Sequence, residues 1–267
     1  MRILLVEDDE QAGAAFAENT NSQAADGIDT FNINNERGPT VFDLTHVWKF
    51  NLIYLIPTPV HSEGILSKMV NGWRLGGITT IQTGYPFSPA LNVERSQSGV
   101  EGASAGVDRP NIVAGRTPYN ITHGVSSGCL GVPAGTPLGT QALWYDPCAF
   151  TIPDQGFLGN VGRNTLRGPG FQDLDFSVSK NTALKFLGEG GGVEFRAEIF
   201  NILNHPNFAL PSRTVYAGTL PAASNKAVAN GLAETALETP FTGAGLIGAT
   251  VGFASSRQVQ LALKVLF

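Results

Sequence analysis

The side chains best suited to chemistry are the carboxylates Asp173 and Asp175, which stand two positions apart. On a strand, residues at this spacing project from one face, as a paired-carboxylate hydrolase requires. No further residue is positioned to complete such a site, and a hydrated surface accounts better for the pair. The four histidines share no spacing typical of metal ligands, such as HxH or HExxH, so we expect structural roles for them. They are His46, His61, His123 and His205.

Glycine-rich segments are the next candidates, because such loops can bind phosphate groups. The run GEGGG at 188–192 is not followed by Lys-Ser or Lys-Thr, and no strand-loop-helix pattern surrounds it. A tight turn is the more natural role for these glycines. Two GxSxG strings occur, GASAG (102–106) and GVSSG (124–128), but neither follows a predicted strand, as a nucleophile elbow requires. The sequence therefore predicts no catalytic residue, no cofactor and no metal site, and we expect a protein that is not an enzyme.

The two cysteines, Cys129 and Cys148, are 19 residues apart in a stretch rich in glycine and proline. In an oxidising compartment this pair predicts a disulfide, and two cysteines alone do not suggest a metal site. The alternative of two unpaired thiols stays open, because the sequence does not give the distance between them.

Composition narrows the fold class. Only 15% of the 267 residues are charged, against a globular norm of about 25%. Thirty-two glycines, 16 prolines and 16 phenylalanines favour strands and turns over long helices. A net charge of −5 argues against nucleic-acid binding, which requires a basic face. No apolar run approaches the roughly 18 residues of a transmembrane helix. An all-β soluble protein and a transmembrane β-barrel remain.

Five segments alternate between apolar and polar residues, as strands with two different faces do. In the clearest polar row, Glu194, Arg196 and Glu198 alternate with apolar residues of the same segment. Such a row requires bulk water or a hydrated lumen, although alternation alone does not separate a lipid-facing strand from a half-buried soluble one. The five segments are 41–57, 73–87, 171–182, 193–203 and 257–267.

The connections favour the barrel. Long and short ones alternate, with the long ones at 11–40, 88–170 and 204–256. Outer-membrane barrels have long extracellular loops and short periplasmic turns, so a periplasmic C-terminus places every long connection outside. The 83 residues of 88–170 also exceed what a compact soluble domain accommodates without structure of its own. We therefore predict an all-β antiparallel meander, a partial transmembrane β-barrel with long extracellular loops.

Aromatic residues suggest two interfacial girdles. Three of them, Tyr54, Trp73 and Phe267, are predicted near the periplasmic interface. Four others are predicted near the outer interface, although ordinary core aromatics at strand ends are the alternative. These four are Phe42, Tyr85, Phe87 and Phe171.

The end of the chain resembles a known sorting signal. Apolar residues at every second position up to a terminal phenylalanine are similar to the C-terminal signal read by the outer-membrane barrel assembly machinery. The residues of this signal are Val259, Leu261, Leu263, Val265 and Phe267.

Five longer strings resemble the C-terminal end of the barrel of Oar-like TonB-dependent receptors. These strings are ERGPTVFDLTH (36–46), NGWRLGGITTIQTGYPFS (71–88), GRNTLRGPGFQDLDFSVSKN (162–181), VEFRAEIFNILNHPNF (193–208) and RQVQLALKVLF (257–267). The resemblance implies a large outer-membrane protein with an N-terminal carboxypeptidase-regulatory-like domain, a plug and a barrel of about 22 strands. Five strands do not close a barrel, so it also implies that 11–267 is a fragment, not competent for transport alone.

The first ten residues, MRILLVEDDE, resemble the start of a response-regulator receiver domain, in which Asp8 and Asp9 would help to hold Mg²⁺. No aspartate lies in FNLIYLIPTP (50–59), where the phosphorylated residue would be expected, so we interpret 1–10 as an artefact of a start codon, frameshift or fusion. The segment is also too short for a signal peptide.

These observations define the expected partners: outer-membrane lipid, the barrel assembly machinery, and the TonB complex through a missing N-terminal part. The complete protein is expected in the outer membrane. A secreted or surface β-sheet protein with a binding or adhesion role is the alternative, in which 88–170 would contact an extracellular ligand.

Overall fold

The computed structural model describes residues 34, 37–58, 64–92, 95–96, 108–184, 188, 191–216 and 239–267. Its largest element is a five-stranded sheet in the order β1-β2-β8-β9-β11, and each neighbouring pair is antiparallel. The strands are β1 (Val47–Leu55), β2 (Trp73–Gln82), β8 (Phe171–Ala183), β9 (Gly192–Phe200) and β11 (Gln258–Leu266). The prediction of an all-β antiparallel meander is confirmed. The receiver-like segment 1–10 lies outside the described residues.

Three predicted segments, 41–57, 73–87 and 193–203, extended well past the observed strands at their outer ends. The first strand starts at Val47, so His46 lies just before it. The fourth strand ends at Phe200, three residues before the predicted end, because Asn201 adopts a φ of 47°. A residue in this left-handed region cannot continue a strand.

The register places all five apolar rows on one side of the sheet. Directly paired residues share a face, and Leu75 pairs with Val178, Val178 with Ala197, and Ala197 with Leu261. The opposite face carries Glu194, Arg196 and Glu198. Because a one-residue slip in any pair would mix the two faces, the common register is strong evidence that each strand has one apolar and one polar environment.

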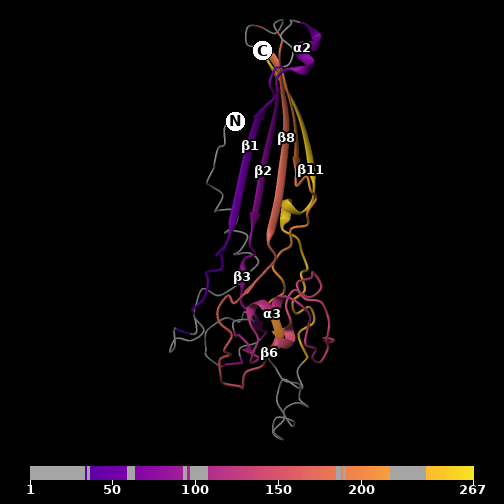
Figure 1. Cartoon of the computed structure of the whole chain (residues 1–267). Helices are drawn as coiled ribbons and strands as arrows, with labels where there is room; N and C mark the ends of the chain where they lie inside the picture. Colours follow the sequence, from indigo (N-terminus) through magenta and orange to yellow (C-terminus); the bar gives the residue numbers. More distant parts are fainter. Residues whose placement is uncertain are drawn as a thin grey trace.

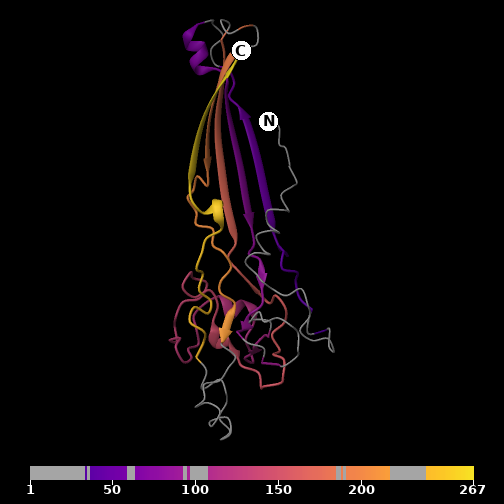
Figure 2. The same ribbon diagram turned by 180° about the vertical axis from the view of Figure 1, so that it is seen from behind.

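The described parts of the connections 88–170 and 204–256 lie at one end of the sheet, and the C-terminus lies at the other (Figure 1). Figure 2 shows the same separation from behind. We call these the outer end and the inner end. A nine-residue strand such as β11 rises about 30 Å, and with a tilt of about 40° it spans roughly the 25 Å apolar band of an outer-membrane barrel.

The outer connections fold into a compact unit, which we call the cap (83–92, 95–96, 108–170, 205–216 and 239–251). Every buried hydrophobic residue among the described positions belongs to it. Its core contains Phe87, Leu91, Tyr145 and Val215. Short elements frame this core: β3 (Pro86–Phe87), β4 (Ala90–Leu91), β5 (Asn111–Ile112), α3 (Pro118–Thr122), η2 (Pro147–Ala149), β6 (Phe150–Thr151), β7 (Leu166–Arg167) and β10 (Thr214–Tyr216).

The cap bears on two predictions. The segment 88–170, predicted as a long extracellular loop, contributes most of the cap core. The outer aromatic girdle was partly wrong: Phe87 is 1% exposed inside the cap, and Phe171 pairs with Gln82 on the polar face. Alternation of polar and apolar residues does not reveal side chains that pack within a loop.

The inner end is small. It contains the helix α2 (Ile65–Val70) between β1 and β2, and the turn between β8 and β9, in which Gly191 N donates to Gly188 O over 3.1 Å. The side chain of Phe267 is almost fully exposed. A short 3-10 helix, η5 (Gly252–Ser255), precedes β11 near the outer end. In the part of the chain that the structure describes, no helix has the length and apolarity needed to cross a membrane.

Candidate functional site

The polar face of the sheet carries charges of both signs. Along β9, Arg196 forms ion pairs with Glu194 and Glu198, with N–O distances of 3.1 and 3.6 Å. In the strand register, Lys264 of β11 lies directly opposite Glu194 of β9. These side chains are only partly buried, so each ion pair contributes about 1 kcal/mol or less and needs continued contact with water. The face is therefore suited to line a hydrated space.

The two aspartates proposed for chemistry lie on this polar face. Asp175 Oδ1 accepts a hydrogen bond of 2.9 Å from Asn201 N and so fixes the end of β9. Asp173 pairs with Thr80, and its Oδ1 is buried without a hydrogen-bond partner in the described structure. The geometry gives Asp175 a structural role at the end of β9.

Where the sheet enters the cap, segments distant in sequence are joined by a group of hydrogen bonds that we call the rim junction. Its centre is Asn164, which is 2% exposed and has a φ of 52°. Asn164 Nδ2 donates to Pro39 O over 2.7 Å, and Asn164 N donates to Ser88 Oγ over 2.8 Å. The Ser88 hydroxyl donates in turn to Asn164 Oδ1 over 3.2 Å.

Arg167 forms the second part of the rim junction. Its guanidinium donates to Asp43 O over 3.0 Å and to Gly84 O over 3.2 Å, and it forms an ion pair with the Asp43 carboxylate. Gly168 N donates to Tyr85 O over 2.9 Å. The backbones approach closely here, since a Cβ on Gly84 would lie 1.9 Å from Gly168 O. Glycine is needed at this position.

The turn after β9 forms the third part. Asn207 is fully buried, and its side-chain amide forms two hydrogen bonds with the backbone of Gln172. Asn207 Oδ1 accepts from Gln172 N, and Asn207 Nδ2 donates to Gln172 O, each over 2.9 Å. Asn201 Oδ1 accepts from His205 N, also over 2.9 Å. Arg257 N donates to Asn204 Oδ1 over 3.2 Å and so attaches the segment before β11. The turn binds β8, β9 and the entry to β11 at one level.

Inside the cap, the buried carboxylate of Asp146 organises the disulfide region. Asp146 Oδ1 accepts from the Ser126 hydroxyl over 2.7 Å, and Oδ2 pairs with Arg116 over 3.0 Å. Cys148, two residues later, is joined to Cys129 by a disulfide with a Cα–Cα distance of 5.5 Å. The Ser126 hydrogen bond and the disulfide together attach the segment 125–137 to the cap core.

Two aromatic residues bind the cap segments to each other and to the rim. The hydroxyl of Tyr145 donates to Ser212 O over 3.0 Å, and complete burial raises the pKa of this phenol well above its usual range. The indole of Trp144 donates to Arg167 O over 2.8 Å and so connects the cap to the rim junction. The outer surface of the cap stays open to solvent, with Tyr119 and Phe157 largely exposed.

Four residues of the C-terminal signal lie on the strand at one edge of the sheet, β11, and the fifth, Phe267, directly follows it. They share its apolar face and are mostly exposed; Leu261 and Leu263 are 71% and 69% exposed. An apolar row this exposed would be unfavourable in water and is favourable in lipid. Whether the assembly machinery reads this row stays a prediction.

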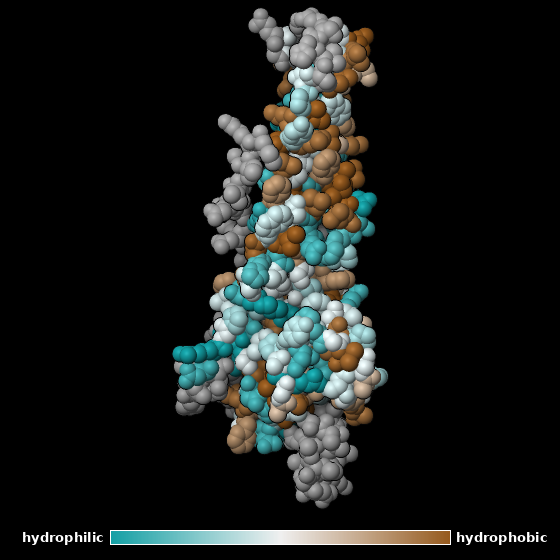
Figure 3. All heavy atoms as spheres, in the orientation of Figure 1, coloured by the Kyte–Doolittle hydropathy of each residue, from teal (hydrophilic) through white to brown (hydrophobic). Residues whose placement is uncertain are grey.

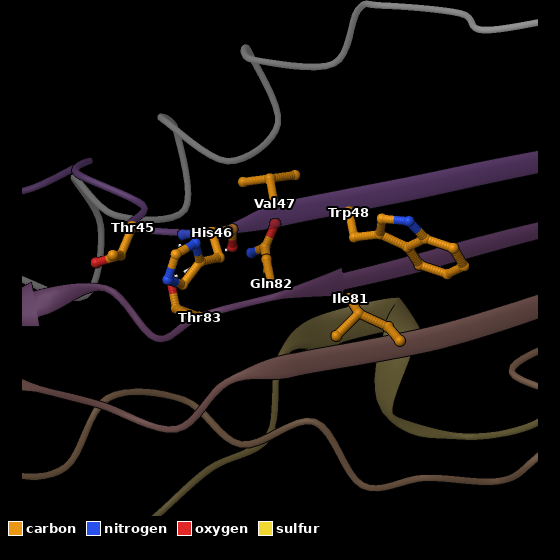
Figure 4. A pocket seen from close by; sticks show the side chains of 7 residues that line it. All are labelled: Thr45, His46, Val47, Trp48, Ile81, Gln82 and Thr83. Carbon is orange, nitrogen blue, oxygen red and sulfur yellow. Dashed lines mark hydrogen bonds between the residues drawn. The ribbon is translucent and has the colours of Figure 1, made fainter.

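Figure 4 shows a shallow hollow at the opposite edge, between the outer ends of β1 and β2. His46 lies beside Thr83: Thr83 N donates to His46 O over 3.0 Å, and His46 N donates to the Thr83 hydroxyl oxygen over 3.2 Å. Trp48 and Ile81 of the apolar face form part of its wall. Among the residues that line the hollow, His46 is the single titratable side chain.

Sequence reasoning identified the strands and the cysteine pair, and it missed the rim junction and the cap. Asn164, Arg167 and Asn207 lie within the strings that resemble the receptor family, so their presence in those strings was the available signal. Among the residues that the structure describes, no three His, Cys, Asp or Glu side chains are grouped as metal ligands.

Comparison with known proteins gives one family. The sequence matches the model of an outer membrane beta barrel domain over residues 8–260. No curated protein and no solved structure matches the chain. The family match covers almost all of the 267 residues, and the sheet has the lipid-type and lumen-type faces that the family requires. The chain therefore belongs to the outer membrane beta barrel domain family and is located in the outer membrane.

Proposed function

We propose that residues 11–267 form the C-terminal barrel segment of an Oar-like TonB-dependent receptor. In this proposal the segment does not transport alone; the complete protein imports large, scarce solutes or serves in surface assembly. The polar face would line the lumen, and the cap would meet the ligand first. The role is non-enzymatic, in keeping with the engagement of Asp175 by Asn201 rather than by a reactive partner.

One observation carries this proposal. All five strings that resemble the receptor family contribute hydrogen bonds at the outer rim: Pro39 and Asp43 from the first, Gly84 and Ser88 from the second, Asn164 and Arg167 from the third, Asn201 and Asn207 from the fourth, and Arg257 from the last. The resemblance therefore coincides with one structural unit, the junction that holds the cap over the polar face.

The proposal is tested on the native protein. An antibody raised against the cap should detect, in the outer-membrane fraction of the source cells, a protein much larger than 28.2 kDa. The same band should be retained by an immobilised periplasmic domain of TonB, and retention should disappear when the TonB-contacting segment of the complete protein is deleted. A 28.2 kDa band that TonB does not retain would contradict the proposal.

A second function, surface binding or adhesion without transport, is favoured by the cap itself. It has its own core and presents exposed aromatic residues such as Tyr119 and Phe157. This function predicts that cell-surface attachment by the protein is unchanged in cells without TonB. Loss of the protein's activity in those cells supports transport instead, because only transport requires energy from TonB.

A further inference from the structure

The helix α2 at the inner end exposes an unusual amount of apolar surface for its length. Four of its six residues are Ile65, Leu66, Met69 and Val70, and none of the six is buried. Exposure reaches 80% for Ile65 and 65% for Met69. At about 100° per residue these four side chains fall within an arc of about 140°, and Lys68 lies outside it. The helix is therefore amphipathic, with an apolar side that the described protein does not cover.

Two side chains of the sheet hold α2 in place. The indole of Trp73 donates to Met69 O over 3.1 Å, and Lys180 Nζ donates to Lys68 O and Asn71 O over 2.7 and 2.6 Å. The same ammonium lies 5.2 Å from the centre of the Trp73 ring. The orientation of α2 is thus set by direct bonds to the sheet.

Both of these side chains belong to the apolar face of the sheet. Trp73 lies opposite Lys180 in the strand register, two residues along from the pair Leu75 and Val178, so all four side chains project from the same face. Lys180 is the only charged residue on that face within the five strands. A lysine at the margin of a lipid-facing surface extends its ammonium toward the polar boundary, and tryptophan prefers the same depth. Trp73 and Lys180 therefore mark the level at which the apolar band ends.

We propose that α2 lies in the periplasmic leaflet as an interfacial helix, with its four apolar side chains among phospholipid acyl chains and Lys68 at the headgroup phosphates. The argument is continuity: the lipid-facing surface of the sheet runs through Trp73 and Lys180 directly onto α2. Figure 3 shows hydrophobic side chains along the sheet and again at its upper end, over α2. This geometry is that of amphipathic helices buried about 5–10 Å into the headgroup boundary. It follows from the membrane barrel and does not depend on TonB.

Spin-label accessibility tests the proposal on the full chain inserted in phosphatidylethanolamine–phosphatidylglycerol vesicles. The two native cysteines are bonded to each other, so a third cysteine provides a unique thiol. Nitroxides are attached to Leu66→Cys, to Leu263→Cys as the lipid reference, and to Leu130→Cys as the water reference. Leu130 is 57% exposed and Leu66 is 64% exposed, so the two leucines start from similar environments in the protein.

The expected result is that Leu66→Cys collides with oxygen more often, and with a water-soluble nickel chelate several-fold less often, than Leu130→Cys does. Its depth should be shallower than that of Leu263→Cys. Nickel accessibility equal to that of Leu130→Cys would overturn the proposal. Dipolar broadening of the Leu66→Cys spectrum, removed by dilution with unlabelled protein, would overturn it as well, because a second copy would then cover the helix.

Discussion

At the scale of single residues, the cap depends on polar groups that are buried but engaged. Tyr145 shows this most clearly, because its ring packs 5.8 Å from that of Phe87 while its hydroxyl bonds Ser212 O. Asp146, the next residue, accepts from Ser126 and pairs with Arg116. A buried polar group with all its hydrogen bonds formed lowers the stability of the fold only slightly, whereas removing one of its partners lowers it by about 1–3 kcal/mol.

Tyr145 makes the stability of the cap sensitive to alkaline pH. Burial raises the pKa of its phenol, so the folded cap retains a proton that the unfolded chain releases near pH 10. Above about pH 10 the cap should therefore lose up to about 1.4 kcal/mol of stability per pH unit from this group. Tyr145→Phe should cost about 1 kcal/mol at pH 7, through the lost bond to Ser212 O, and should flatten the decline above pH 10.

Denaturant midpoints of the cap, followed by near-ultraviolet circular dichroism at pH 7, 10 and 11, measure both effects. The matched control is Tyr119→Phe, since Tyr119 is 72% exposed. In this control variant, the stability of the cap should decline with pH as steeply as it does in the wild type. If Tyr145→Phe and wild type decline in parallel, the pH dependence does not come from Tyr145.

At the scale of elements, the apolar and polar rows of β11 should respond in opposite ways to charge. Leu261 lies in the middle of the apolar row and neighbouring Gln260 lies on the polar face, opposite Glu198. Leu261→Arg should cost about 2–4 kcal/mol if the row faces the middle of the bilayer. Gln260→Arg should be neutral or slightly stabilising. Guanidinium titration of the chain folded in lipid vesicles compares the two, and equal costs would mean that neither face is in lipid.

The contact between the rim and the cap should depend on Gly84. An alanine Cβ there would lie 1.9 Å from Gly168 O, so the two backbones must separate. We expect Gly84→Ala to cost about 1–3 kcal/mol, as for other overpacked sites, and to expose 163–169 to protease. Gly248→Ala is the control, because a Cβ added at Gly248 would meet no atom within 4 Å. Equal protease sensitivity of the two variants would show that this close approach is dispensable.

The sequence predicted the elements better than their ends or the cap, for physical reasons. Strands alternate with a period of two, so Leu261, Leu263 and Val265 could be assigned to one face without a structure. The end of β9 depends on the left-handed backbone of Asn201, which alternation does not reveal. The cap core brings together Phe87, Tyr145 and Val215 from two- and three-residue strands and from irregular segments, which have no period at all.

At the scale of the whole molecule, two kinds of stabilisation meet at the rim. The sheet has no buried hydrophobic residue of its own among the described positions and is suited to lipid, whereas the cap has a conventional water-excluded core. The cap segments come from both sides of β8 and β9, and the parallel pair β4–β10 joins them. The cap can therefore lose structure without any change in the pairing of the five strands.

The disulfide provides the test of this independence. Cys129 and Cys148 close a loop of 19 residues inside the cap, for which chain entropy predicts a stabilisation of about 3 kcal/mol. The double variant Cys129→Ser, Cys148→Ser should become sensitive to protease within 125–148 while the strands remain protected in lipid vesicles. Adding a reductant to wild type should have the same effect, and adding it to the double variant should change nothing. If the strands lose protection together with the cap, the sheet and the cap form a single cooperative unit, and the rim junction couples them more strongly than the separation of their cores suggests.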